Sequence, residues 1–276
     1  MVARCAGDGA FGPVLVSDNN HAGQCYSFDF TLLFEESIFS IAPCALALPI
    51  FALRVLQLRK EHVPWMVSPQ RIWRSVTYIA IASIQLALVA LWGTGRGVLT
   101  RTTLASAILA FLSTLAVLVL SNYNLYRSIR PSATVQAFLL ATILLDLPRV
   151  RTQWLLDDNT LVARLFTVTF ALRVVAVVLE SFNAYRDDAI PQQKRRELGL
   201  DPESNTVPPE MRQGIIGLTF FSWLNPLFWK GYRKNLTMDD LYAIDPKLEG
   251  DVLHARLLKS WNSGMTSSLI KTLYRD

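Results

Sequence analysis

The chain has 276 residues, 51% of them apolar, a formal net charge of +5 and a mean hydropathy of +0.29. That hydropathy is high for a soluble protein and low for a chain lying wholly in a bilayer, so we expect a membrane part joined to a polar part. The positive charge does not indicate a nucleic-acid partner. Cytosolic basic residues facing anionic lipid account for it, and no zinc-finger, RNP or helix-turn-helix pattern is present.

Five apolar runs approach or reach the length of about 20 residues that a helix needs to cross a bilayer. The first has the acidic pair Glu35 and Glu36 near its start, and the fourth is shorter and ends near Pro148. Adjacent acidic residues point in different directions on a helix, so Glu35 and Glu36 make a poor acid–base pair. The runs are residues 30–53, 75–92, 102–120, 132–150 and 161–180. They predict an all-α membrane protein with five transmembrane helices.

The distribution of Lys and Arg between the loops predicts the orientation of these helices. With five spans, the side that holds the first long loop and the C-terminal part carries eleven basic residues, and the opposite side carries five. Basic residues accumulate on the cytosolic side of membranes. We therefore expect an outer or lumenal N-terminal tail, residues 1–29, and a cytosolic C-terminus. The plasma membrane and the vacuolar membrane both fit this orientation.

The three cysteines fall in two different settings. Cys44 lies inside the first apolar run, where a small buried hydrophobic residue is the simplest interpretation. Cys5 and Cys25 lie in the N-terminal tail, and an oxidising compartment favours a disulfide between them. Two free thiols in the tail are equally compatible with the sequence.

Charged residues inside the apolar runs are functional-site hypotheses, because they are costly in a bilayer. Arg173 is the deepest of those in the fifth run. Two carboxylates could pair with it: Glu180, two turns further along the same face, and Asp146, near the outer end of the fourth run. Two interpretations stay open for Arg173. It fixes helix packing or docks another domain through a polar contact, or it extends along its helix to the membrane interface.

The composition changes after the fifth run. Residues 181–213 are rich in charge and proline and cannot bury enough apolar surface to fold alone, so we predict a cytosolic linker. Beyond it, Pro226 is expected to kink or end a helix, and three cations follow at once. An apolar helix face beside cations is typical of a helix lying in the membrane interface. The residues at helical spacing that predict this face are Ile216, Phe220, Trp223 and Leu227.

Two helix signals follow the basic cluster. Thr237 and Asp240 have the spacing of a capping box, which predicts a short helix starting at Met238. Residues 248–261 form another amphipathic stretch on the same side of the membrane.

The stretch "FSWLNPLFWKGYRKNLTMDDLYAIDP", residues 221–246, resembles the segment that opens the first core transmembrane domain of C-subfamily (multidrug-resistance-associated) ABC transporters. Upstream, "FDFTLLFEESIFSI" at Phe28 and "VLESFNAY" at Val178 resemble the amino terminus and the end of the fifth span in filamentous-fungal members. The resemblance thus covers the whole chain. The matching residues form a core motif and a cap after it: Ser222, Trp223, Asn225 and Pro226, then Thr237, Asp239 and Asp240.

The resemblance implies a domain organisation. Residues 30–180 correspond to a five-span accessory membrane domain with an external tail, and residues 181–213 to a cytosolic linker called the lasso. Residues 214–276 correspond to an elbow helix at the inner leaflet and the incomplete start of the first core domain. The resemblance also implies a disulfide between Cys5 and Cys25, and it implies the bilayer and the remaining transporter core as partners.

Full-length members of that family bind ATP and Mg²⁺ in two further domains. This chain has no Gly-x-x-x-x-Gly-Lys-Ser/Thr phosphate loop, since "GTGRG" at Gly93 lacks the lysine. We therefore expect no enzyme activity, catalytic residue, metal site or cofactor in the chain. We expect a fragment truncated before the core, serving assembly, trafficking or regulation. The alternative is a stand-alone membrane module that binds another transporter or channel.

Overall fold

The computed structural model describes residues 13–14, 29–59, 70–94, 100–128, 131–155, 160–181, 208–242 and 250–263. The chain divides into two compact units, residues 1–183 and residues 184–276. Cys5, Cys25 and nearly all of the predicted linker lie outside the described residues, so the structure does not bear on those predictions.

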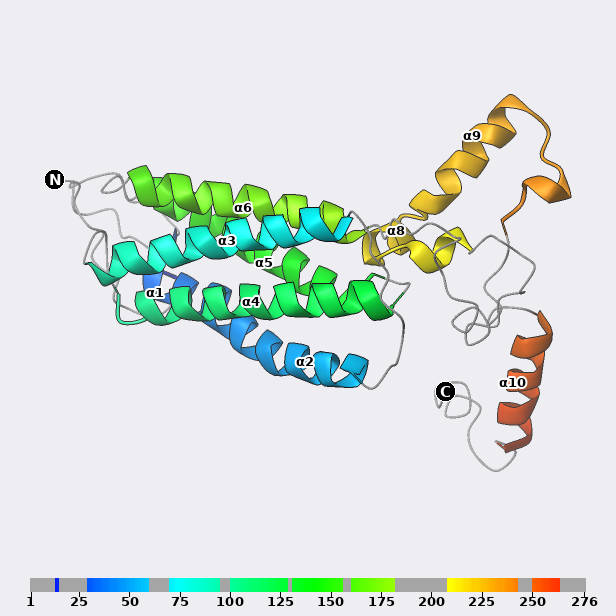
Figure 1. Ribbon diagram of the computed structural model, residues 1–276, viewed down its shortest axis with the longest axis horizontal. Coiled ribbons are helices and arrows are strands. Elements are labelled where there is room, and N and C mark those ends of the chain that lie inside the picture. The colour runs from blue at the N-terminus through cyan, green and yellow to red at the C-terminus, as the bar shows by residue number, and fades with distance from the viewer. Residues whose placement is uncertain are drawn as a thin grey trace. The chain divides into compact units, whose positions relative to one another are not determined.

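The described residues of the first unit form five long helical segments, which lie alongside one another in Figure 1. Each is long and apolar enough to cross a membrane, which confirms the prediction of an all-α membrane protein with five spans. The first span is a continuous rod of α1 (Leu32–Phe34), the π-helix η1 (Glu35–Ile41) and α2 (Ala42–Arg59). The others are α3 (Gln70–Gly93), α4 (Thr103–Arg127), α5 (Ala133–Leu155) and α6 (Thr160–Ser181).

Three features differ from the sequence expectation. α5 does not end near Pro148 but continues to Leu155. A proline removes one backbone donor, and membrane helices tolerate this loss where a neighbouring helix packs against them, as α6 packs against α5. The π-helix η1 leaves no signal in a hydrophobicity pattern. Before the first span, β1 (Pro13–Val14) pairs antiparallel with β2 (Asp29–Phe30).

The five spans close into a ring. α2 packs on α4, α4 on α3, α3 on α6 and α6 on α5, and α5 returns to contact α2 and η1. The outer surface is apolar, with Leu46 69% exposed and Leu144 73% exposed. An apolar outer surface of this kind favours contact with the acyl chains of membrane lipids. Buried polar side chains come from every span and lie inside the ring.

The described residues of the second unit form short helical segments. They are η3 (Pro209–Arg212), α8 (Ile215–Thr219), η4 (Ser222–Leu224), α9 (Asn225–Arg233), η5 (Met238–Asp240) and α10 (Gly250–Ser263). η5 is a single turn, so the short helix predicted to start at Met238 goes no further than Asp240. α10 occupies most of the second amphipathic stretch.

The prediction that Ile216, Phe220, Trp223 and Leu227 share one helix face is wrong, because these residues fall on separate helical segments. Phe221 has a left-handed backbone with φ of 49°, and it separates α8 from η4. Pro226 lies in the first turn of α9, where the missing N–H would have no partner in any case. Pro226 therefore helps to start a helix instead of ending one.

Candidate functional site

A buried ion pair lies where α6 ends, and we call its surroundings the α6-end cluster: Arg74, Tyr78, Ser121, Gln136 and Glu180. Arg74 Nη1 lies 3.2 Å from Glu180 Oε2, and the two side chains are 3% and 0% exposed. The Tyr78 hydroxyl donates to Glu180 Oε1 at 3.1 Å, and the Ser121 hydroxyl donates to the same oxygen. The Glu180 carboxylate is thus compensated by a cation and two hydroxyls from α3 and α4.

The same cluster caps the last turn of α6. The final carbonyls of a helix have no partner within the helix. Here Arg74 Nε and Nη2 donate to the Leu179 carbonyl at 3.0 and 2.7 Å, and Gln136 Nε2 donates to the Glu180 carbonyl at 2.6 Å. Side chains from α3, α4 and α5 therefore fix the end of α6.

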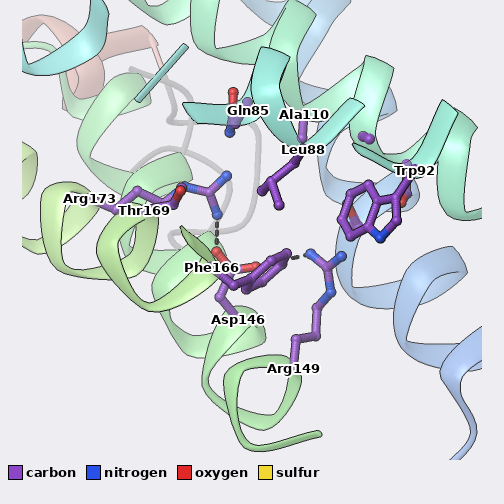
Figure 2. A pocket seen from close by; sticks show the side chains of 12 residues that line it. Gln85, Leu88, Trp92, Ala110, Asp146, Arg149, Phe166, Thr169 and Arg173 are labelled. Carbon is purple, nitrogen blue, oxygen red and sulfur yellow. Dashed lines mark hydrogen bonds and ion pairs between the residues drawn. The ribbon is translucent and has the colours of Figure 1, made fainter. Parts of the chain in front are cut away.

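A second ion-pair group, the mid-bundle cluster, joins α5 to α6: Asp146, Arg149 and Arg173, with Gln85 beside them (Figure 2). Thr114 on α4 is hydrogen-bonded to Gln85. Asp146 pairs with Arg149 at 3.1 Å and with Arg173. The Arg149 guanidinium also lies 4.9 Å from the centre of the Phe166 ring. The Gln85 side-chain amide fits its neighbours when its oxygen and nitrogen exchange positions. In that orientation the oxygen accepts from Arg173 Nη2 at 3.1 Å, and the nitrogen donates to the Thr114 hydroxyl at 2.8 Å.

The contacts in these two clusters decide between the two interpretations of Arg173, a polar contact inside the membrane or extension to the interface. Its guanidinium is bound to Asp146 on the neighbouring helix, and its side chain is only 11% exposed, so it does not extend along its own helix to the interface. Glu180 is not its partner, because the Glu180 carboxylate is bound to Arg74. Arg74 was missed in the sequence because it lies near the start of a span, where a basic residue suggests only orientation.

The π-helix directs Glu35 and Glu36 to different helices, and both side chains are buried. Glu35 Oε1 accepts from the Thr152 hydroxyl on α5 at 2.7 Å. Glu36 accepts from three hydroxyls at the start of α4, with two of the bonds at 2.7 Å. The expectation that the two carboxylates do not act as a pair agrees with this geometry. The donors to Glu36 are Thr100, Thr102 and Thr103.

In the second unit, α9 carries an exposed aromatic face next to cations. Phe228, Trp229 and Tyr232 are all exposed and lie within one turn of one another. The Trp229 and Tyr232 rings stack at 6.1 Å, and the Arg233 guanidinium lies 4.9 Å from the Trp229 ring centre. Aromatics beside cations suit the headgroup region of a bilayer. The sequence pattern predicted an apolar face between residues 216 and 227, and it did not identify the exposed aromatic face of α9.

The cap after α9 ties that helix to the following turn. The Thr237 N–H donates to Asp240 Oδ2 at 3.2 Å, which forms a capping box. Lys230 bonds the same carboxylate, and this hydrogen bond, followed by the Thr237 backbone bond, holds the pKa of Asp240 well below its ordinary value. Because the folded-state pKa is lowered, the contribution of Asp240 to stability is present above about pH 4 and declines as the pH falls further.

The remaining motif residues have modest contacts. The Ser222 hydroxyl donates to the Gly217 carbonyl at 3.5 Å, and the Trp223 ring lies 6.3 Å from that of Tyr242. Among the described residues, Trp223 Nε1 is buried without a hydrogen-bond partner. Asn225 begins α9. The side chain of Asp239 lies outside the described part of the chain.

Five apolar helices, an apolar outer surface and ion pairs inside the ring define a polytopic α-helical membrane protein. No family model matches the chain. Its homologues are fungal ABC transporters. The ABC multidrug transporter lscH of Purpureocillium lilacinum is 33% identical over 237 residues, which is 85% of this chain and 14% of that protein.

Two further relatives extend the comparison. ABC multidrug transporter B of Aspergillus fumigatus is 30% identical over 240 residues, 85% of this chain and 16% of its own length. The ABC-type transporter braE of Annulohypoxylon truncatum is 29% identical over 290 residues, 99% of this chain and 18% of its own length. The chain therefore spans less than a fifth of the length of these curated relatives.

Proposed function

We propose that the chain is the accessory membrane domain, lasso linker and elbow helix of a C-subfamily ABC exporter of the multidrug or secondary-metabolite type. The match of 85% of the chain to the ABC multidrug transporter lscH carries this proposal. The five spans of the first unit and the aromatic, basic α9 of the second support it. The N-terminal tail is external or lumenal, and the second unit is cytosolic, in a plasma or vacuolar membrane.

The chain contributes to assembly, trafficking or regulation of the exporter and has no ATP chemistry of its own. ATP-binding loops of the Gly-x-x-x-x-Gly-Lys-Ser/Thr type hold phosphates with backbone N–H groups and a lysine, and the sequence contains no such loop. ATP and Mg²⁺ are bound by other parts of the exporter. The exported compound contacts those other parts as well.

The membrane unit works as a rigid anchor in this proposal. The α6-end cluster fixes the residue from which the linker leaves the membrane, since Arg74 and Gln136 bind the last carbonyls of α6. The linker then carries a second unit whose α9 lies in the cytosolic headgroup region through Phe228, Trp229 and Tyr232.

A second candidate function, a stand-alone module that binds another membrane protein, is favoured by one observation. α10 exposes an apolar row at helical spacing, Leu253, Leu257 and Trp261, exposed by 41%, 52% and 53%. Such a row suits a protein partner. The same row serves the leading proposal if the partner is the transporter core.

The proposal predicts that the chain associates with an ABC core. The tagged chain is co-expressed with a fungal ABC transporter that lacks the aligned segment, and both are purified in mild detergent. We expect the core to co-purify, and Leu257→Glu with Trp261→Glu to reduce capture by at least about tenfold, because burying each apolar side chain is worth roughly 1.5–3 kcal/mol.

The matched control is Lys259→Glu, which adds a negative charge to the opposite side of α10 and should leave capture unchanged. Failure of the unaltered chain to retain any core contradicts the proposal. Retention of a different membrane transporter or channel, in place of the core, supports the stand-alone module.

A further inference from the structure

The exposed aromatic face of α9 is bordered by a cation that has no acidic partner. Phe228, Trp229 and Tyr232 are 63%, 60% and 85% exposed. Arg233, one turn after Trp229, is exposed as well, and its guanidinium lies 4.9 Å from the Trp229 ring centre. Among the described residues, no carboxylate pairs with Arg233. The charge at the edge of the aromatic face is therefore open to an anionic ligand.

The two lysines of this segment are instead bound within the protein. Lys230 pairs with Asp240 Oδ1, and Lys234 Nζ lies 3.5 Å from Asp240 Oδ2. An α-helix turns about 100° per residue, which puts Lys230 on nearly the opposite side of α9 from Tyr232. Asp240 thus engages two of the three cations, and Arg233 is left beside the aromatic face.

The chemistry of Arg233 and of the rings beside it favours a lipid phosphate. The guanidinium fork matches two phosphate oxygens, and a guanidinium that contacts a ring still presents N–H donors at its edge. Tryptophan and tyrosine rings prefer the headgroup level of a bilayer, where the lipid phosphates lie. An anionic headgroup has a negative charge that no ammonium group of its own compensates, so it complements Arg233 better than a zwitterionic headgroup does.

We propose that Arg233 and Trp229 form a binding site for the phosphate of one anionic phospholipid, while Phe228 and Tyr232 lie among the neighbouring headgroups. The cytosolic leaflet is the one in which anionic lipids are enriched. This inference rests on the proposed function, in which α9 lies at that leaflet. It adds the class of lipid that is bound and the residue that selects it.

The test uses the full chain labelled with fluorotryptophan, in nanodiscs of phosphatidylcholine with increasing amounts of phosphatidylserine. Fluorine NMR follows each tryptophan, and Trp229→Phe assigns the Trp229 resonance. We expect this resonance to shift saturably as phosphatidylserine increases, because the lipid phosphate binds Arg233 over that ring. Trp92 is 7% exposed within the first unit, so its resonance should stay in place and serves as the internal control.

Two variants of equal charge separate a binding site from a general attraction. Arg233→Gln should raise the phosphatidylserine fraction at the half-maximal shift about fivefold, because one basic residue near an anionic surface contributes about 1 kcal/mol. Lys234→Gln removes the same charge from a lysine that Asp240 already engages, so it should change that fraction by less than about twofold. Arg233→Lys keeps the charge without the planar fork and should lie between the two.

Equal effects of Arg233→Gln and Lys234→Gln would overturn the proposal, because net charge alone would then explain the response. A Trp229 shift produced by inorganic phosphate in pure phosphatidylcholine nanodiscs would also overturn it. A lipid with gadolinium at its headgroup separates this failure from a failure of the proposed function. Broadening of the Trp229 resonance without any shift overturns the lipid site but keeps α9 at the membrane, whereas no broadening at any lipid composition contradicts both.

Discussion

Arg74→Met is expected to lower the free energy of unfolding of the membrane unit by about 3–5 kcal/mol, because it leaves the buried Glu180 carboxylate without a cation. Among the described residues, the Glu180 carboxylate then keeps the hydroxyls of Tyr78 and Ser121. The Leu179 carbonyl at the end of α6 also loses its donors from Arg74. Unfolding in mixed micelles with increasing SDS measures the change.

The control for that substitution is Arg164→Met, which removes an exposed arginine of α6 and should change the free energy of unfolding by less than about 0.5 kcal/mol. The double variant Arg74→Met with Glu180→Gln removes both charges, so it should be more stable than the sum of the two single effects. Equal losses in Arg74→Met and Arg164→Met would show that the ion pair does not stabilise the unit.

Asp146→Asn is also expected to lower the free energy of unfolding of the membrane unit by about 3–5 kcal/mol, because two buried guanidinium groups lose their common carboxylate. Arg173→Gln should cost less, because Asp146 keeps Arg149 at 3.1 Å. Combining the two substitutions should recover part of the loss, by roughly 1–3 kcal/mol relative to additivity. The same SDS unfolding assay measures all three variants, and strict additivity would contradict a direct pair between Asp146 and Arg173.

The sequence was sufficient for the five spans because each is an apolar run of membrane length, and this signal needs no tertiary information. It also identified Asp146, Arg173 and Glu180 as costly charges inside spans. Asp146 and Arg173 are 27 positions apart on two consecutive helices. Asp146 lies 9 positions before the end of α5 at Leu155 and Arg173 lies 13 positions after the start of α6 at Thr160. An antiparallel hairpin therefore leaves them about one helical turn apart in height, and the long arginine side chain spans this offset.

The partner of Glu180 could not be deduced in the same way. Arg74 and Glu180 belong to α3 and α6, which are separated by two other spans, and only the closure of the ring brings them together. The π-helix η1 sets the directions of Glu35, Glu36 and Ser40, and a pattern of ordinary helical period does not locate it.

The error in the second unit has a local cause. Ile216, Phe220, Trp223 and Leu227 satisfy a helical period, but Phe221 takes a left-handed conformation that interrupts the helix. A phenylalanine rarely adopts this conformation, so no residue pattern in this segment predicts the break. The exposed face of Phe228, Trp229 and Tyr232 follows from the new helix start at Asn225.

Five spans place the two termini on opposite faces of the membrane, and we propose that the N-terminal tail is outside or lumenal and that the linker and α9 are cytosolic. The most direct test places one epitope at the N-terminus and another at the C-terminus, in sealed membranes of known orientation. We expect antibody or protease to reach the N-terminal epitope from the outer or lumenal face only, and the C-terminal epitope from the cytosolic face only. Detection of both epitopes from the same face would contradict the account.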